Sequence, residues 1–125
     1  MSGAHDGQGA GPRKLAIIGG GKMGGPIVRR VVETGLLPPG QVVVGEPLEA
    51  IRNDLAARLG VATVAENSAA VTGADTVLLA VTPQVMPAVI QDLRERLEPE
   101  QLVVSIAAGV TLTTLTEGLR HSAVV

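Results

Sequence analysis

Short apolar segments alternate with amphipathic segments along most of this chain. The runs 15–18, 41–45, 61–64, 76–81 and 102–106 consist mainly of Val, Leu, Ile and Ala, as do strands buried on both faces of a parallel sheet. Between these runs, apolar residues recur at steps of three and four, which predicts amphipathic helices. The alternation predicts an α/β fold: a doubly wound parallel sheet with helices on both faces and right-handed crossovers.

Apolar faces and helix-breaking residues set the expected boundaries of the first two helices. The first helix is expected to carry an apolar face from Met23 to Leu36. The second is expected to begin at Pro47, because proline suits a first helical turn, and to bury a face from Leu48 to Leu59.

The later helices are predicted from caps and prolines. Asn67 and Ser68 are expected to cap a short Ala-rich helix. Pro83 can begin the next helix, whose apolar face runs to Leu97, and Thr111 is expected to cap the last one. The chain then ends in a further apolar run that resembles the start of a sixth strand.

The most informative stretch follows the first predicted strand. Gly19, Gly21 and Gly24 form the pattern G-x-G-x-x-G between that strand and an amphipathic helix. In a Rossmann-type domain the first glycine permits a sharp turn, the second lets the backbone approach a pyrophosphate, and the third lets helix and strand pack closely. Glu46 follows the second strand about 20 residues further on, where a carboxylate accepts hydrogen bonds from the adenosine ribose. This combination predicts a dinucleotide-binding domain.

Three loops are expected to meet at one cleft. If the strand order is 3-2-1-4-5-6, the first and fourth strands flank the point where the order reverses, and ligands bind beyond the carboxyl ends of strands there. The loops 19–24, 81–83 and 107–109 would then converge. Small or rigid residues in the last two loops suit a backbone close to a flat nicotinamide ring.

Composition narrows the possible functions. The chain has no aromatic residue and a net charge of −2 without a basic cluster, which argues against nucleic-acid binding. It has no cysteine, which excludes disulfides and thiolate metal sites and is compatible with a cytoplasmic location. No apolar run approaches the ~18 residues of a membrane helix. Residues 1–13 are predicted to form a disordered tail, and 14–125 the dinucleotide-binding domain.

Few other side chains suggest chemistry. His5 and His121 are expected at the surface, without a partner that would indicate a base or a ligand. The charged run 94–98 is expected to be the solvated face of a helix. The carboxylates show no metal-site spacing, so no metal site is predicted and the catalytic residues stay unknown.

Three separated motifs carry a resemblance to a known family. Residues 17–24 are similar to I-G-x-G-x-M-[AG], residues 79–84 to L-A-V-K-P-Q, and residues 104–111 to V-S-I-A-A-G-V-[ST]. These are motifs of the amino-terminal domain of pyrroline-5-carboxylate reductases, and the resemblance runs from about Lys14 to Val125.

The resemblance implies hydride transfer from NADPH or NADH to the C=N bond of 1-pyrroline-5-carboxylate, a small-molecule substrate, to give L-proline. It implies that the glycine turn holds the pyrophosphate, that Glu46 holds the ribose, and that Asn67 contacts the cofactor. The loops after the fourth and fifth strands would hold the nicotinamide half. The implied cofactor-binding residues are Ile18, Gly19, Gly20, Gly21, Lys22, Met23, Gly24, Glu46, Asn67, Ala80, Val81, Thr82, Pro83, Ile106, Ala107 and Ala108.

Departures from the family pattern refine these expectations. Many members carry an arginine at the end of the second strand, suited to a 2′-phosphate, whereas this chain has Glu46 and no arginine before Arg52. An acid there repels a 2′-phosphate, which favours NADH over NADPH. Thr82 stands where the family has lysine. Members of the family continue into a helical domain that forms the homo-oligomer and binds substrate, so these 125 residues are expected to bind cofactor but to reduce little or no imine.

Two alternatives stay open. The run from Gly19 to Ile27, with Gly24-Gly25-Pro26, is also similar to the G-x-G-x-M-G-x-P-M motif of 3-hydroxyisobutyrate-type hydroxyacid dehydrogenases. The second alternative is a non-catalytic nucleotide-binding domain, since fold alone does not imply function.

Overall fold

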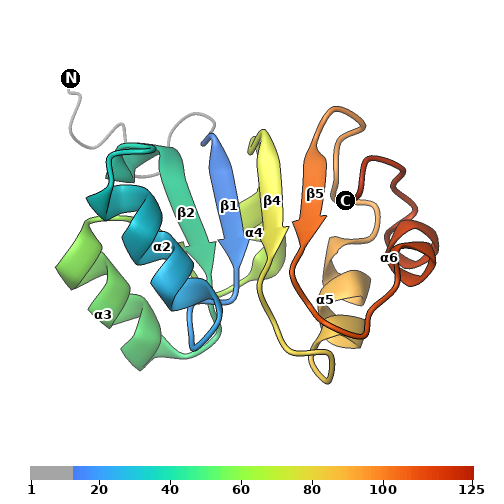
Figure 1. Ribbon diagram of the computed structural model, residues 1–125, viewed down its shortest axis with the longest axis horizontal. Helices are drawn as coiled ribbons and strands as arrows, with labels where there is room; N and C mark the ends of the chain where they lie inside the picture. The colour runs from blue at the N-terminus through green and yellow to red at the C-terminus, as the bar shows by residue number, and fades with distance from the viewer. Residues whose placement is uncertain (1–12) are drawn as a thin grey trace.

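Five parallel strands form one sheet in the order β3-β2-β1-β4-β5 (Figure 1). The computed structural model describes residues 13–125. The strands are β1 (Leu15–Ile18), β2 (Val42–Gly45), β3 (Ala62–Val64), β4 (Thr76–Leu79) and β5 (Leu102–Ser105). The helices are α2 (Gly24–Glu33), α3 (Glu49–Leu59), α4 (Asn67–Val71), α5 (Met86–Leu93) and α6 (Leu112–Leu119), with a short 3₁₀ helix η1 (Pro39–Gln41). The predicted doubly wound sheet and its strand order are confirmed.

Helices cover both faces of the sheet, and each face has its own apolar core. On one face Ile17 and Leu78 pack with Val28 of α2 and Leu55 of α3. On the other face strand residues such as Leu79 pack with α4, α5 and α6. Adjacent strand residues therefore point into opposite cores, which explains why the central strands are apolar throughout. Burying a Leu or Ile side chain completely stabilises the folded state by about 2 kcal/mol. The buried Val, Leu, Ile, Ala and Met side chains together build both cores without an aromatic residue.

The last residues extend the sheet beyond β5. Val124 forms a parallel bridge with Val103, and the Val125 N–H donates to the Val103 carbonyl at 2.9 Å. This places the apolar end of the chain where a sixth strand of the predicted order would lie.

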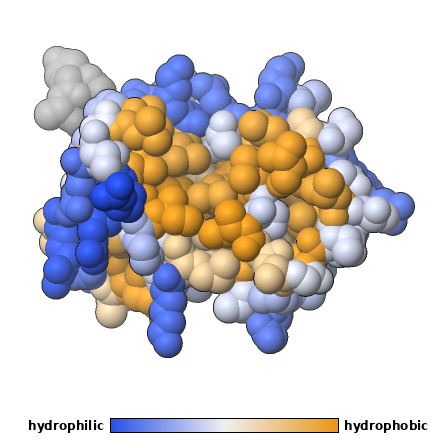
Figure 2. Space-filling view, viewed as in Figure 1, coloured by the Kyte–Doolittle hydropathy of each residue, from blue (hydrophilic) through white to orange (hydrophobic). Residues whose placement is uncertain are grey.

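One half of the front face is less covered than the other. In Figure 1, α2 and α3 lie in front of the sheet near β2, while within the described residues no helix lies in front of β4 and β5. Figure 2 shows hydrophobic residues gathered across the middle of this face. Leu102 and Ile106 are 38% and 41% exposed, and they share a strand face with Val104, which packs at the edge of the α2–α3 core.

Two helix starts differ from the sequence expectation. α5 begins at Met86 rather than at Pro83, because the Val85 and Met86 N–H groups donate to the Thr82 carbonyl and close a turn first. Pro87 then falls in the first helical turn, where its missing N–H breaks no helical bond. α3 begins at Glu49, so Pro47 lies before the helix.

Several apolar positions expected on helix faces lie outside the helices. Leu36 follows the end of α2 and is 72% exposed, and Leu48 precedes α3 and is 60% exposed. α5 ends at Leu93, where Glu95 adopts a positive φ of 70° and turns the chain away. Leu97 still packs against the core, from the loop and not from the helix.

His121 is buried, so the expectation that it lies at the surface is wrong. Arg120, which follows α6, has a left-handed φ of 54° and turns the chain back toward the sheet. The His121 Nε2 then lies 2.6 Å from the Gln101 carbonyl oxygen at the start of β5. The Gln101 side chain donates in turn to the Val71 and Ala74 carbonyls at 2.7 Å each. A buried polar group must be hydrogen-bonded in this way to be tolerated.

Arg13, assigned to the end of the predicted tail, is buried, and its carbonyl accepts a hydrogen bond from the Asp75 N–H at 3.2 Å. The rest of that predicted tail, and His5 within it, lies outside the described residues.

Among residues 13–125, each helix is too short or too polar to cross a lipid bilayer.

Candidate functional site

The turn between β1 and α2 depends on two glycines that the protein's own packing requires. Gly19 has a φ of 102°, and a Cβ there would lie 2.6 Å from the Ala80 carbonyl oxygen at the end of β4. A Cβ on Gly24 would lie 1.6 Å from the Gly19 carbonyl oxygen. Since real Cβ atoms do not approach so closely, the first turn of α2 packs on the end of β1 only when position 24 is glycine.

Gly21 differs from these two glycines. A Cβ built on it meets no atom of residues 13–125 within 4 Å, and its φ is not in the left-handed region. Nothing in the fold therefore requires glycine there. Gly21 lines a cleft, so its backbone is exposed to that cleft without a side chain. A backbone kept bare toward a cleft at the start of a helix is what close approach of a pyrophosphate needs.

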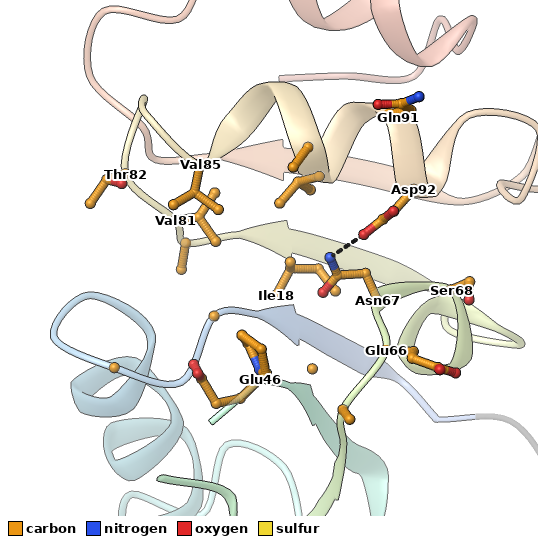
Figure 3. Close-up of a pocket in the computed structure, with 18 of the residues that line it drawn as sticks. Ile18, Glu46, Glu66, Asn67, Ser68, Val81, Thr82, Val85, Gln91 and Asp92 are labelled. Atoms are coloured by element: carbon orange, nitrogen blue, oxygen red, sulfur yellow. Dashed lines mark hydrogen bonds between the residues drawn. The ribbon is translucent and has the colours of Figure 1, made fainter. Parts of the chain in front are cut away.

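The cleft has a volume of about 1390 Å³ and lies beyond the carboxyl ends of β1, β2 and β4 (Figure 3). This is large enough for a dinucleotide-sized ligand, since pockets for drug-sized ligands occupy about 300–1,000 Å³. It is lined by ten of the residues that the sequence and the resemblance indicated: Ile18, Gly19, Gly21, Lys22, Met23, Glu46, Asn67, Ala80, Val81 and Thr82.

Six of the indicated residues do not line this cleft. Gly20 and Gly24 lie in the turn but face the protein: a Cβ on Gly20 would meet Leu55, and Gly24 packs on Gly19. Pro83 is exposed in the turn before α5. The loop 106–108 follows β5, one strand further from β1, and its Ile106 N–H donates to the Leu79 carbonyl at 3.2 Å.

Glu46 connects the glycine turn to the segment that leads into α3. Its side chain is buried, with Oε1 accepting from the Gly20 N–H at 2.9 Å and Oε2 accepting from the Leu48 N–H at 3.0 Å. Arg52 donates from Nη1 to the Glu46 and Pro47 carbonyls, both at 2.8 Å. A carboxylate can accept about four hydrogen bonds, so each Glu46 oxygen keeps a lone pair for a ligand.

Asn67 does not cap α4, so that expectation is wrong. The N-cap position belongs to Glu66, which makes no side-chain capping bond, and Asn67 is the first residue of the helix. Its Nδ2 instead donates to Asp92 Oδ2 on α5 at 3.1 Å, the bond drawn in Figure 3. Asn67 and Asp92 therefore join two helices across one side of the cleft.

The sequence patterns did not indicate the part of the cleft formed by α5 and the loop after it, nor the residues around Glu46 and Asn67. The missed lining residues are Gly45, Pro47, Ala65, Glu66, Ser68, Val85, Ala88, Val89, Gln91, Asp92, Arg94, Glu95 and Arg96. The spacing of Val85, Ala88 and Asp92 at three and four residues could have indicated that one face of α5 borders the site. The charges at 94–96 are exposed as expected, but they lie in the turn after α5 and not on a helix, and they line the cleft.

The lining carries charges of both signs. Lys22 lies on the glycine turn, whereas Glu46, Glu66 and Asp92 lie at the ends of β2, β3 and α5. Among residues 13–125, no three His, Cys, Asp or Glu side chains are grouped to hold a metal ion. The cleft therefore offers one cation at the turn and acids toward α4 and α5, with Arg94 and Arg96 in the loop after α5.

A glycine turn at the central strand, opening on a cleft at the carboxyl ends of parallel strands, defines a Rossmann-like domain of the NAD(P)-binding type. Residues 14–109 match the family described as NADP oxidoreductase, coenzyme F420-dependent, and the chain belongs to this family.

Similar proteins agree with the resemblance found in the motifs. The chain is 35% identical over 107 residues to the pyrroline-5-carboxylate reductase of Methanosarcina acetivorans, covering 86% of this chain and 40% of that protein. It is 38% identical over 102 residues to that of Pseudomonas aeruginosa, covering 82% and 37%. The solved structure of a pyrroline-5-carboxylate reductase from Coxiella burnetii matches with a TM-score of 0.81 at 30% identity, covering 86% and 40%. The chain thus spans about two fifths of the length of these relatives.

Proposed function

We propose that this chain is the cofactor-binding part of a pyrroline-5-carboxylate reductase, which reduces the C=N bond of 1-pyrroline-5-carboxylate to L-proline with NADH or NADPH. One observation carries the cofactor part of the proposal: Gly21 lines the cleft although no contact within residues 13–125 requires glycine there. The substrate part is supported by the names of relatives that are 35% and 38% identical to the chain.

The glycine turn is the proposed pyrophosphate site. The Gly20 N–H is already bonded to Glu46, whereas within residues 13–125 the N–H groups of Gly21, Lys22 and Met23 have no acceptor. These donors precede the positive end of α2, where an anion is stabilised. Lys22 adds a mobile positive charge, because its side chain is exposed at the same turn.

The end of β2 is the proposed adenosine ribose site. Glu46 lines the cleft and keeps lone pairs that hydroxyl groups of a ribose can use. Arg52 donates to two carbonyl groups and does not line the cleft, so it offers no cation at the cleft surface to a 2′-phosphate. We therefore propose a preference for NADH, since a carboxylate repels a 2′-phosphate.

The end of β4 is the proposed site of the nicotinamide half. Ala80, Val81 and Thr82 line the cleft beside the glycine turn, with small or β-branched side chains that leave room for a flat ring. The loop 106–108 follows the neighbouring strand β5 and would extend this site. A bound nicotinamide supplies the hydride, while these residues hold the ring in place and exclude water on the side of the sheet.

Parallel calorimetric titrations of the chain with NADH and NADPH test this proposal. We expect both cofactors to bind and NADH to bind more tightly. Tighter binding of NADPH would contradict the role given to Glu46, and no binding of either cofactor to the folded chain would refute the proposed function. A reductase assay with 1-pyrroline-5-carboxylate then measures how much imine these residues reduce by themselves.

A further inference from the structure

A side-chain hydrogen bond links the two helices beside the proposed ribose site. Asn67, at the start of α4, donates from Nδ2 to Oδ2 of Asp92, near the end of α5, at 3.1 Å. Both residues line the cleft, and Figure 3 shows them pointing toward each other from opposite elements. Nothing in the proposed function requires Asp92, so any role of this bond in cofactor binding has to come from what it does to Asn67.

The bond fixes which end of the Asn67 amide faces the ligand. An ionised carboxylate only accepts hydrogen bonds, so the amide nitrogen must face Asp92 and the amide oxygen must face away. That oxygen is directed toward the end of β2: a Cβ built on Gly45 would lie 3.3 Å from Asn67 Oδ1. Without Asp92 the amide could turn over and present its NH₂ group instead.

We infer that Asp92 is a positioning residue that sets cofactor specificity by holding the Asn67 carbonyl oxygen toward the ribose end of the cleft. The inference rests on the proposed function, because it assumes that a dinucleotide occupies this cleft. The Asn67 carbonyl oxygen is then a second hydrogen-bond acceptor beside Glu46, next to Gly45. Two acceptors suit the hydroxyl groups of an unphosphorylated ribose, and neither can donate to a 2′-phosphate.

Asp92→Asn tests this inference, because an amide at position 92 can donate as well as accept and so lets the Asn67 amide turn over. We expect the ratio of the NADPH and NADH dissociation constants to fall about five-fold, the effect of one altered hydrogen bond to a ligand. Glu66→Gln is the matched control. It removes one negative charge from the same end of the cleft, and Glu66 makes no side-chain hydrogen bond to Asn67. Its expected change in the ratio is less than about two-fold.

A double-mutant cycle separates positioning from charge. In an Asn67→Ala background, Asp92→Asn should change the ratio no more than Glu66→Gln does, because the amide that it positions is gone. An equal shift with and without Asn67 would overturn the inference, as would an unchanged ratio in the single variant. Melting temperatures confirm that each variant is folded, which is expected since Asp92 is exposed. Failure of the unaltered chain to bind either cofactor would refute the proposed function and this inference with it.

Discussion

Substituting alanine at two glycines of the same turn should separate folding from ligand binding. Gly24→Ala puts a methyl group 1.6 Å from the Gly19 carbonyl oxygen and 2.7 Å from its carbonyl carbon. Gly21→Ala puts the same group into open space at the glycine turn, which lines the cleft. The two variants have the same composition and lie three residues apart, so each is the control for the other.

The packing gives opposite signs for the two changes in stability. A carbon atom ordinarily stays about 3.3 Å from a carbonyl oxygen, so Gly24→Ala forces α2 or the turn to move by roughly 1.7 Å. Such overpacking costs about 3 kcal/mol, offset by up to ~1 kcal/mol of helix propensity. Gly21→Ala creates no contact and restricts the unfolded chain, which should stabilise the fold by about 0.5 kcal/mol.

Thermal unfolding followed by circular dichroism, with calorimetric titration of NADH, measures both effects. At about 4 °C per kcal/mol for a domain of this size, Gly24→Ala should lower the melting temperature by about 10 °C, and Gly21→Ala should raise it slightly. Gly21→Ala should nevertheless weaken NADH binding about ten-fold or more, because the methyl group occupies the proposed pyrophosphate site.

Either of two results would refute this reasoning. If Gly21→Ala binds NADH as tightly as the unaltered chain, the pyrophosphate does not approach position 21. If Gly24→Ala melts within about 2 °C of the unaltered chain, the contact between α2 and β1 is not tight enough to require glycine.

Two further substitutions test the buried network and the charge at the turn. Gln101→Ala should lower the free energy of unfolding in urea by about 3 kcal/mol, because it removes the side-chain hydrogen bonds to the Val71 and Ala74 carbonyls and to the Glu98 N–H. The exposed Glu100→Ala should change it by less than ~0.5 kcal/mol, and equal losses would contradict the role of the network. Lys22→Gln should weaken NADH binding about three-fold at low salt and less at high salt. The control is Lys14→Gln, which should leave the NADH affinity unchanged because Lys14 pairs with Asp75. A salt-independent loss in Lys22→Gln would exclude a charge effect.

Local patterns predicted the elements that hold the glycine turn. Four apolar residues from Leu15, a glycine triplet and a period of three to four residues are short-range signals, and the structure has β1, the turn and α2 in those places. The Thr111 cap is equally local, and its hydroxyl oxygen accepts from the Thr114 N–H at 3.1 Å. Such predictions succeed because the residues that decide them are neighbours along the chain.

The incorrect expectations concern residues whose partners are distant in sequence. Asparagine often caps helices, but the Asn67 amide bonds to Asp92, 25 residues further on. His121 lies near the end of the chain, but it is buried against Gln101, 20 residues earlier. Neither partner is visible in a local pattern, since a polar side chain close to an element end can bond to the nearest backbone or to another helix.

The sequence by itself determined the class of fold, the glycine turn and the acid after the second strand, because hydrophobic periodicity and glycine geometry act over a few residues. The tertiary structure alone decided which glycines serve packing and which keeps the cleft open, since that depends on what lies opposite each one. It also decided that α5 borders the cleft, and that Glu46 is held by two backbone N–H groups. These features arise where segments distant in the chain meet at the ends of parallel strands, and only the packing of the sheet brings them together.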